Sequence, residues 1–283
     1  MNNIVFLNNK FLPRDKAKVS VFDRGFIYGD GVFETIRSYN GRVFAFDLHF
    51  IRLSEGIKAL AIPIRLKEDY LLSCIKELLR RNNLNNTDAN IRITVTRGTD
   101  YGSLAPSKSL KPTLAITAKP SNPKIKDYQR KGVKTVFLNY KRPLPQIKSL
   151  NLLPNITGII EAKKIKAQEG IFTNGDKILE GTITNLVISD GKSIKTPPIK
   201  DGILPGITRR LVIELAKAQG IKVTEVSLTK KDLKNCKEAF LTNSIMEIVP
   251  LVKIEDKLIG NGSPGTLTRR LQEMYKYMLT KTS

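Results

Sequence analysis

Histidine and cysteine are scarce in this sequence. Its 283 residues include one histidine, His49, and two cysteines, Cys74 and Cys236. The cysteines provide neither a disulfide framework nor metal-ligand spacing, and a single histidine excludes a metal site built from a histidine cluster. A lone histidine also argues against a histidine-based catalytic triad. The sequence therefore predicts no metal site.

Long apolar segments are also missing. No run approaches the ~20 consecutive apolar residues that cross a bilayer, and the first three residues do not begin a signal peptide. The hydrophobic content of 41% and the charged content of 26% are ordinary for a globular protein. These features predict a cytoplasmic protein without a membrane partner, with enough chain for one large domain or two moderate ones.

Acidic residues are few relative to basic ones. The chain has 26 acidic and 48 basic residues, which gives a net charge of +22. Such an excess is typical of proteins that bind nucleic acid, but these lysines are dispersed and no basic tail, zinc finger or RNA-binding aromatic signature accompanies them. The densest lysine groups, at 163–166 and 230–234, fall on polar faces of predicted helices. We therefore expect no nucleic-acid partner, although the charge would attract phosphorylated or carboxylate ligands.

Hydrophobic periodicity predicts a mixed α/β fold. Asp47 is expected to cap one helix, and further helices are expected at about 67–81, 153–168, 205–220 and from 264 onward. Strands are expected near 3–7, 10–12, 90–97, 113–118, 133–138, 221–227 and 238–243. A further strand is expected to end at residue 189. Residues 119–128 contain Pro120 and Pro123 and form the best candidate linker. The expected domains are therefore a small one at 1–118 and a larger one at 129–283.

Lys148 lies between apolar residues in the run Ile147-Lys148-Ser149-Leu150. A lysine held against apolar surroundings loses hydration, so its pKa falls and its neutral amine becomes a usable nucleophile or base. Enzymes that form a Schiff base need such an amine. The alternative is a structural lysine whose stem packs on apolar surface while its ammonium group reaches water.

Three further positions provide groups that a phosphorylated cofactor requires. The helix start at Pro205 offers backbone N–H groups and the Thr208 hydroxyl to a phosphate. Arg52 offers a bidentate, charge-assisted contact. Glu180 begins the run Glu-Gly-Thr-Ile-Thr-Asn, a turn in which a carboxylate can meet a ring nitrogen. Together with Lys148, these groups match those that hold pyridoxal phosphate, although each of them alone also has a structural interpretation.

The order of these motifs resembles one family over essentially the whole chain. The Gly-rich run at 23–34 (Asp-Arg-Gly-Phe-Ile-Tyr-Gly-Asp-Gly-Val-Phe-Glu), the His-x-x-Arg-Leu motif at 49–53 and Thr-Arg-Arg at 268–270 resemble the class IV, fold-type IV pyridoxal-phosphate enzymes. This family includes branched-chain transaminases, D-amino acid transaminases and 4-amino-4-deoxychorismate lyases. The resemblance implies that Lys148 is the Schiff-base lysine and general acid/base, and that Glu180 binds the pyridine nitrogen.

The same resemblance implies the remaining site residues. Cofactor contacts are expected from Arg52, Thr182, Ile183, Thr184, Ile207, Thr208, Thr242 and Asn243, with Arg52, Ile207 and Thr208 at the phosphate. The expected substrate pocket contains Tyr28, Phe33, Arg37 and Ser244. The implied fold is a small α/β domain plus a larger cofactor-binding domain with a β-barrel-like sheet. The implied partner is a second subunit in a homodimer with shared active sites, which the loop at 99–106 reaches.

The branch of the family is less sharply marked. Leu152 stands where branched-chain transaminases usually have a tyrosine, and the 99–106 loop lacks the arginine and histidine of the best-known D-amino acid transaminases. The Phe-Glu-Thr-Ile-Arg run at 33–37 and the Thr-Asn-Ser turn at 242–244 resemble the lyases. We interpret the chain as an aminotransferase that moves an amino group between a hydrophobic or branched-chain L-amino acid and 2-oxoglutarate. The alternatives are a lyase that releases pyruvate and 4-aminobenzoate, and a D-amino acid transaminase. Arg92 and Arg97 are candidates for the substrate carboxylate or, equally, for structural ion pairs.

Overall fold

The computed structural model describes residues 3–102 and 104–281, and the chain divides into two compact units. The first unit contains Met1–Ser121 and Ile147–Asn151, and the second contains Asn122–Gln146 and Leu152–Ser283. The segment around Lys148 thus belongs to the N-terminal unit, whereas its sequence position had placed it in the C-terminal domain. The expected linker at 119–128 is also largely regular structure, because strand β6 (Thr113–Pro120) and helix α4 (Lys124–Lys131) cover much of it.

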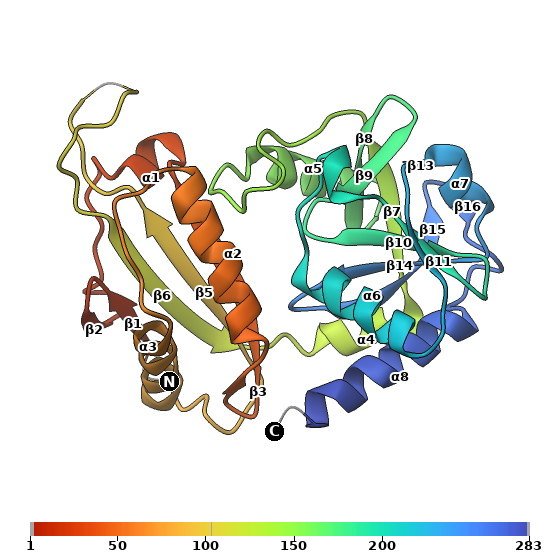
Figure 1. Ribbon diagram of the computed structural model, residues 1–283, viewed down its shortest axis with the longest axis horizontal. Coiled ribbons are helices and arrows are strands. Elements are labelled where there is room, and N and C mark those ends of the chain that lie inside the picture. The colour runs from red at the N-terminus through yellow and green to blue at the C-terminus, as the bar shows by residue number, and fades with distance from the viewer. Residues whose placement is uncertain (1–2, 103, 282–283) are drawn as a thin grey trace. The chain divides into compact units, whose positions relative to one another are not determined.

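The first unit is built on a six-stranded antiparallel sheet in the order β2-β1-β6-β5-β3-β4 (Figure 1). Its other strands are β1 (Ile4–Leu7), β2 (Lys10–Pro13), β3 (Gly31–Tyr39), β4 (Arg42–Val43) and β5 (Ala89–Thr96). Helices α1 (Arg24–Tyr28), α2 (Phe46–Ala59) and α3 (Glu68–Arg81) complete the unit, with α2 packed on β3 and α3 on β1 and β6. The strands expected near 3–7 and 10–12 and the helix expected at about 67–81 are confirmed.

Alternation along β3 gives its two faces different surroundings. Val32 and Ile36 point to the face where α2 and α3 complete the apolar core, and Glu34 points to the same side. Phe33 and Arg37 therefore point to the opposite face. This face of β3 carries the predicted substrate residues of the strand.

Helix α2 begins differently from the sequence-based expectation. Asp47 is not the N-cap: Ala45 occupies that position with φ 49°, and the helix begins at Phe46. Asp47 lies in the first turn, where its charge interacts favourably with the positive end of the helix dipole. The preceding Gly-rich run forms α1, a left-handed turn at Gly29 with φ 68°, and then β3. Gly29 therefore ends helix α1 in the left-handed conformation that favours glycine.

The second unit contains a curled, mixed sheet of ten strands in the order β12-β11-β10-β14-β15-β7-β8-β9-β13, with β16 paired to β15. The strands are β7 (Val133–Leu138), β8 (Glu169–Asn174), β9 (Lys177–Gly181), β10 (Asn185–Ser189), β11 (Ile194–Thr196), β12 (Val223–Glu225), β13 (Leu228–Thr229), β14 (Glu238–Asn243), β15 (Glu247–Ile254) and β16 (Lys257–Leu258). The expected mixed α/β class with a barrel-like sheet is confirmed.

Four further helices surround this sheet: α5 (Leu153–Lys164), α6 (Ile207–Ala218), α7 (Lys230–Asn235) and α8 (Thr266–Lys281). Helices α6 and α8 pack against each other and against β14. Helix α5 ends earlier than the expected residue 168, because Lys166 adopts φ 57° and the chain enters β8. Among the described residues, no helix has the length and apolar character needed to cross a membrane.

Candidate active-site residues

The Lys148 segment is fixed to the start of β3 by backbone hydrogen bonds. Phe33 N donates to Lys148 O at 2.9 Å, and Leu150 N donates to Gly31 O at 2.9 Å. A Cβ atom on Gly31 would lie 2.5 Å from Val95 O and 2.7 Å from Leu150 Cδ1, so only glycine allows this approach. One glycine of the Gly-rich run at 23–34 therefore lies at a close backbone contact, and this contact positions Lys148.

Phe33 brings two cationic side chains together. Lys148 is half-buried and its Nζ lies 4.6 Å from the centre of the Phe33 ring, while Arg92 Cζ lies 3.9 Å from the same point. Burial lowers the pKa of Arg92 from its usual value. Among the described residues, Arg92 forms no hydrogen bond or ion pair. A guanidinium group beside Lys148 is therefore available to a carboxylate ligand.

Glu34 is a fully buried carboxylate that orients Arg52. Arg52 donates Nε to Glu34 Oε1 at 2.7 Å and Nη2 to Glu34 Oε2 at 2.8 Å, and His49 Nδ1 lies 2.7 Å from Oε2. Burial alone would raise the pKa of Glu34, but the charge of Arg52 and the contact with His49 hold it well below its usual range. Burial also lowers the pKa of His49, so the neutral ring donates its Nδ1 proton to the carboxylate.

The contact gives Arg52 a fixed orientation, and its guanidinium group is of the kind that binds a phosphate. Sequence reasoning missed Glu34. The available signal was an acidic residue at the end of the Gly-rich run together with the His-x-x-Arg motif, whose two side chains share one helix face and can contact the same carboxylate.

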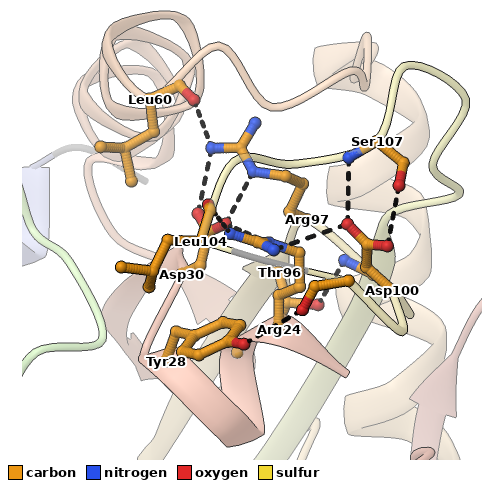
Figure 2. A network of polar contacts seen from close by, with 12 residues as sticks. Arg24, Tyr28, Asp30, Leu60, Thr96, Arg97, Asp100, Leu104 and Ser107 are labelled. Atoms are coloured by element: carbon orange, nitrogen blue, oxygen red, sulfur yellow. Dashed lines mark hydrogen bonds and ion pairs between the residues drawn. The ribbon is translucent and has the colours of Figure 1, made fainter. Parts of the chain in front are cut away.

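Arg97 has the structural role among the two considered for it. It donates Nε and Nη2 to Asp30 at 2.7 and 3.0 Å, and it donates to the carbonyl groups of Leu60 at 2.6 Å and Ala61 at 2.8 Å (Figure 2). These contacts engage its guanidinium group within the N-terminal unit. Arg37 is paired with Asp88 at 2.9 Å, and its predicted contact with a substrate stays a prediction.

Arg24 joins helix α1 to the 99–106 loop. The buried guanidinium donates to Asp30 at 2.8 Å, to Asp100 at 3.5 Å and to Leu104 O at 2.7 Å (Figure 2). It also lies 4.9 Å from the centre of the Tyr28 ring. Tyr28 in turn donates its hydroxyl to Gly102 O at 3.5 Å. The loop and the predicted substrate residue Tyr28 therefore share one anchor, which the sequence did not reveal.

In the second unit, Glu180 is held by a buried arginine. Arg142 donates Nε and Nη2 to Glu180 Oε1 at 3.0 and 2.6 Å. The other oxygen accepts from Leu204 N at 2.9 Å and from Asn185 Nδ2 at 3.5 Å. These contacts fix an acceptor carboxylate of the kind that a pyridine N–H would meet. Arg142 is a further residue that sequence reasoning missed.

The start of α6 has the properties of a phosphate seat. Its N-cap is Gly206, which provides no side-chain cap, so the first N–H groups of the helix depend on other acceptors. Ile207 and Thr208 follow in the first turn and are buried. In β14, on which α6 packs, the buried Thr242 Oγ1 has no hydrogen-bond partner among the described residues. An orphaned hydroxyl and uncapped N–H groups suit an anion with several oxygen atoms.

Two turns of the second unit contain the other predicted cofactor residues. Thr182, Ile183 and Thr184 connect β9 to β10, with both threonines buried and Ile183 exposed. Asn243 Oδ1 accepts from Ile245 N and Met246 N at 2.9 and 2.6 Å, which shapes the turn that includes Ser244. Asn243 Nδ2 donates to Ile183 O at 3.2 Å, so the two turns are in contact.

Comparison with known proteins identifies the family. Residues 31–254 match the class IV aminotransferase family. A Methanocaldococcus jannaschii protein, provisionally named a branched-chain-amino-acid aminotransferase, is 41% identical over 98% of this chain and 96% of its own. A D-alanine aminotransferase from Staphylococcus haemolyticus is 34% identical over 99% of both chains, and an aminodeoxychorismate lyase from Bacillus subtilis is 34% identical over 96% of this chain and 94% of its own.

Solved structures agree with this result. The branched-chain amino acid aminotransferase of Escherichia coli superposes with a TM-score of 0.92 at 28% identity, covering 99% of this chain and 95% of its own. The Thermoproteus uzoniensis enzyme with norvaline gives 0.90 at 29% identity, covering 98% and 94%. The chain therefore belongs to the class IV aminotransferases, the fold-type IV transaminases that depend on pyridoxal phosphate.

Proposed function

We propose that this aminotransferase transfers an amino group between a hydrophobic, branched-chain L-amino acid and 2-oxoglutarate. The observation that carries the proposal is the position of Arg92, a half-buried guanidinium group over the same Phe33 ring as Lys148. A dicarboxylate such as 2-oxoglutarate needs a cation for its second carboxylate, and the Phe33 ring provides apolar surface for a branched side chain. The 41% identity to the methanogen relative supports the same substrate class.

The residues described above divide the work of holding the cofactor. Pyridoxal phosphate, when bound, withdraws electrons from the α-carbon of an attached amino acid. In our proposal Lys148 holds the cofactor covalently and moves the α-proton, and Glu180, fixed by Arg142, accepts a hydrogen bond from the ring nitrogen. Arg52 and the first turn of α6 at Ile207 and Thr208 bind the phosphate, with the Thr242 hydroxyl as a further donor.

We also propose that the enzyme is a homodimer. The N-terminal unit exposes several large apolar side chains on α1, on the chain before it and on the 99–106 loop: Val19, Val21, Phe22, Phe26, Ile27, Tyr28, Tyr101 and Leu104. The Phe22 and Tyr101 rings lie 4.5 Å apart, and Arg24 anchors the loop beneath them. Exposed apolar surface on an anchored scaffold is typical of protein–protein contacts. Light scattering should show a dimer, and Phe26→Asp should weaken it; a monomeric wild-type protein would contradict this proposal.

A lyase is the second candidate. The Bacillus subtilis lyase is as similar as the D-alanine aminotransferases, and the 242–244 turn follows the lyase pattern. Both reactions begin with removal of an α-proton by the lysine, but only a transaminase needs an amino acceptor.

Half-reactions test the proposal and separate these candidates. L-leucine, L-glutamate, D-alanine and D-glutamate would each be added to the holoenzyme while the visible absorbance band of the cofactor is recorded. Loss of the band with the L-series, reversed by the matching keto acids, is the expected result. Loss with the D-series alone would assign a D-amino acid transaminase. No loss with any of the four would favour the lyase, for which release of pyruvate from aminodeoxychorismate is the direct assay.

A further inference from the structure

The turn that follows Glu180 is held by hydrogen bonds to one carboxylate, that of Glu169 at the start of β8. Glu169 Oε1 accepts from Thr182 N at 2.9 Å, from Gly170 N at 3.1 Å and from the Thr182 hydroxyl. Glu169 Oε2 accepts from the Thr184 hydroxyl at 3.3 Å. A single side chain therefore receives hydrogen bonds from both threonines of the turn.

Other contacts fix the remaining groups of this turn. Asn155, in the first turn of α5, donates its Nδ2 to Thr182 O. Within the turn, Gly181 N donates to Thr184 O at 2.8 Å. A Cβ atom on Gly181 would collide with the Thr184 hydroxyl and lie 3.2 Å from the Glu169 carboxyl carbon. The backbone of the turn is therefore in direct contact with the Glu169 carboxylate. A change in the charge of Glu169 should alter the position of the turn directly.

In the part of the chain that the structure describes, no charged side chain forms an ion pair with the Glu169 carboxylate. The charged groups on the neighbouring elements are Lys134 of β7, Glu161, Lys163 and Lys164 of α5, and Lys177 and Glu180 of β9, of which Lys177 pairs with Asp201 at 2.7 Å. Glu161 accepts from the Tyr140 hydroxyl, Lys134 donates to Ile165 O, and Glu180 is paired with Arg142. Among the described residues, Glu169 itself forms no ion pair. Its charge is thus stabilised by hydrogen bonds alone.

We propose that Glu169 is a positioning residue: its ionised carboxylate holds the 181–184 turn, and with it Glu180, in the geometry that receives the cofactor. The proposal rests on the assignment of Glu180 and this turn to the cofactor. Hydrogen bonds to an ionised acceptor are stronger than those to a neutral one, so the turn is held most firmly when Glu169 is charged.

Protonation of Glu169 changes this arrangement in a specific way. Thr182 N and Gly170 N can only donate, so a proton on the carboxyl group must lie on Oε2 and be donated to the Thr184 hydroxyl, which then accepts. Complete burial raises the pKa of Glu169 to about 7, against the lowering effect of its hydrogen bonds. The turn therefore changes its hydrogen bonding close to neutral pH.

Glu169→Gln tests the role because its amide imitates the neutral acid: the oxygen accepts from the two N–H groups and the NH2 donates to Thr184. The dissociation constant of pyridoxal phosphate, measured by fluorescence titration of the apoprotein from pH 6 to 8.5, is the primary readout. As pH is lowered through about 7 and Glu169 becomes protonated, the affinity of the wild-type protein for the cofactor should fall about five-fold. This factor corresponds to the loss of roughly one hydrogen bond. The variant should bind weakly at every pH, without that transition.

Thermal unfolding of the apoprotein is a second, independent test, because the proposal fixes the direction in which stability changes with pH. Because the folded-state pKa lies above the ordinary value of 4.5, the stability that protonation contributes is complete below that value and is lost as pH rises through about 7. Glu169→Gln should therefore be at least as stable as the wild type at pH 8 while it binds the cofactor less well. A merely structural residue would lose both.

Glu238→Gln is the matched control. Glu238 is also a buried strand carboxylate, but it accepts from Leu267 N, Thr268 N and the Thr268 hydroxyl at the start of α8. This variant should retain the wild-type pH transition. Glu180→Ala, measured alongside, separates the two proposals: unchanged affinity there would contradict the assignment of Glu180 itself. Weakened binding in Glu180→Ala together with a wild-type profile in Glu169→Gln would overturn the role of Glu169 alone.

Discussion

Arg142 places two N–H groups on one oxygen of the Glu180 carboxylate, Nε at 3.0 Å and Nη2 at 2.6 Å, and both side chains are buried. Because the second oxygen is held by Leu204 N, the carboxylate has a single orientation. A pyridine nitrogen that binds there meets a preformed acceptor. In the proposed site, the pair would combine a structural contact of the second unit with the electrostatics that the cofactor requires.

Removal of Arg142 should therefore affect both stability and cofactor binding. Arg142→Met leaves the Glu180 carboxylate buried without its cation, which we expect to cost about 3 kcal/mol of unfolding free energy. The double variant Arg142→Met/Glu180→Gln should recover much of this loss, because the uncompensated charge is gone. Chemical denaturation of the wild-type, Arg142→Met, Glu180→Gln and double-variant apoproteins measures the coupling. Equal losses in the single and the double variant would contradict the ion-pair role.

Arg92 and Arg97 provide a matched pair for the substrate proposal. Arg92→Leu should raise the KM for 2-oxoglutarate about 10- to 100-fold, the value of a charge-assisted hydrogen bond, and change the KM for leucine much less. Arg97→Leu breaks the contacts with Asp30 and two carbonyl groups, so it should lower the melting temperature instead. Steady-state kinetics with both substrates checks the expectation. An equal effect of Arg92→Leu on leucine and 2-oxoglutarate would exclude Arg92 as the anchor of the second carboxylate.

The same two arginines show what the sequence could and could not predict. Both follow the pattern of strand β5, but Arg92 lies opposite Thr35 on the face of Phe33, whereas Arg97 follows the last strand residue and meets Asp30. A sequence identifies the residue type and the strand, while the distant partner decides the role. Motifs and the family resemblance therefore pointed to Lys148 and Glu180 as candidates, but they did not show that the Lys148 segment belongs to the first unit. They did not point to Arg142, because its partner is Glu180, far along the chain.

Helix boundaries failed for a related reason. Asp47 is a good N-cap residue, yet Ala45 takes that position in the left-handed conformation, and the helix begins two residues earlier than an Asp47 cap would place it. The long strand β3 was not among the strands expected from the sequence, because its first residues belong to the Gly-rich run at 23–34. Gly31 is glycine because the Lys148 segment and Val95 approach its backbone, a tertiary contact that no local propensity encodes.

The contacts of Glu34 with Arg52 and His49 predict how the stability of the protein depends on pH. The charge of Arg52 and the contact with His49 outweigh burial and hold the pKa of Glu34 below its ordinary value of 4.5. The stability from this network is therefore present above that pH and is lost as pH falls below it. Glu34→Gln should lower the unfolding free energy at pH 7 by about 3 kcal/mol, and the difference from wild type should shrink below pH 4.5.

The exposed Glu77, which pairs with Arg80 and Arg81 on the surface of α3, serves as the control for this prediction. Glu77→Gln should leave the melting temperature unchanged, because exposed ion pairs are screened by solvent. Glu34→Gln should in addition weaken binding of pyridoxal phosphate, since the carboxylate that orients Arg52 has lost its charge. Reduced stability with unaltered cofactor affinity would show that Arg52 is held for the fold and not for the phosphate.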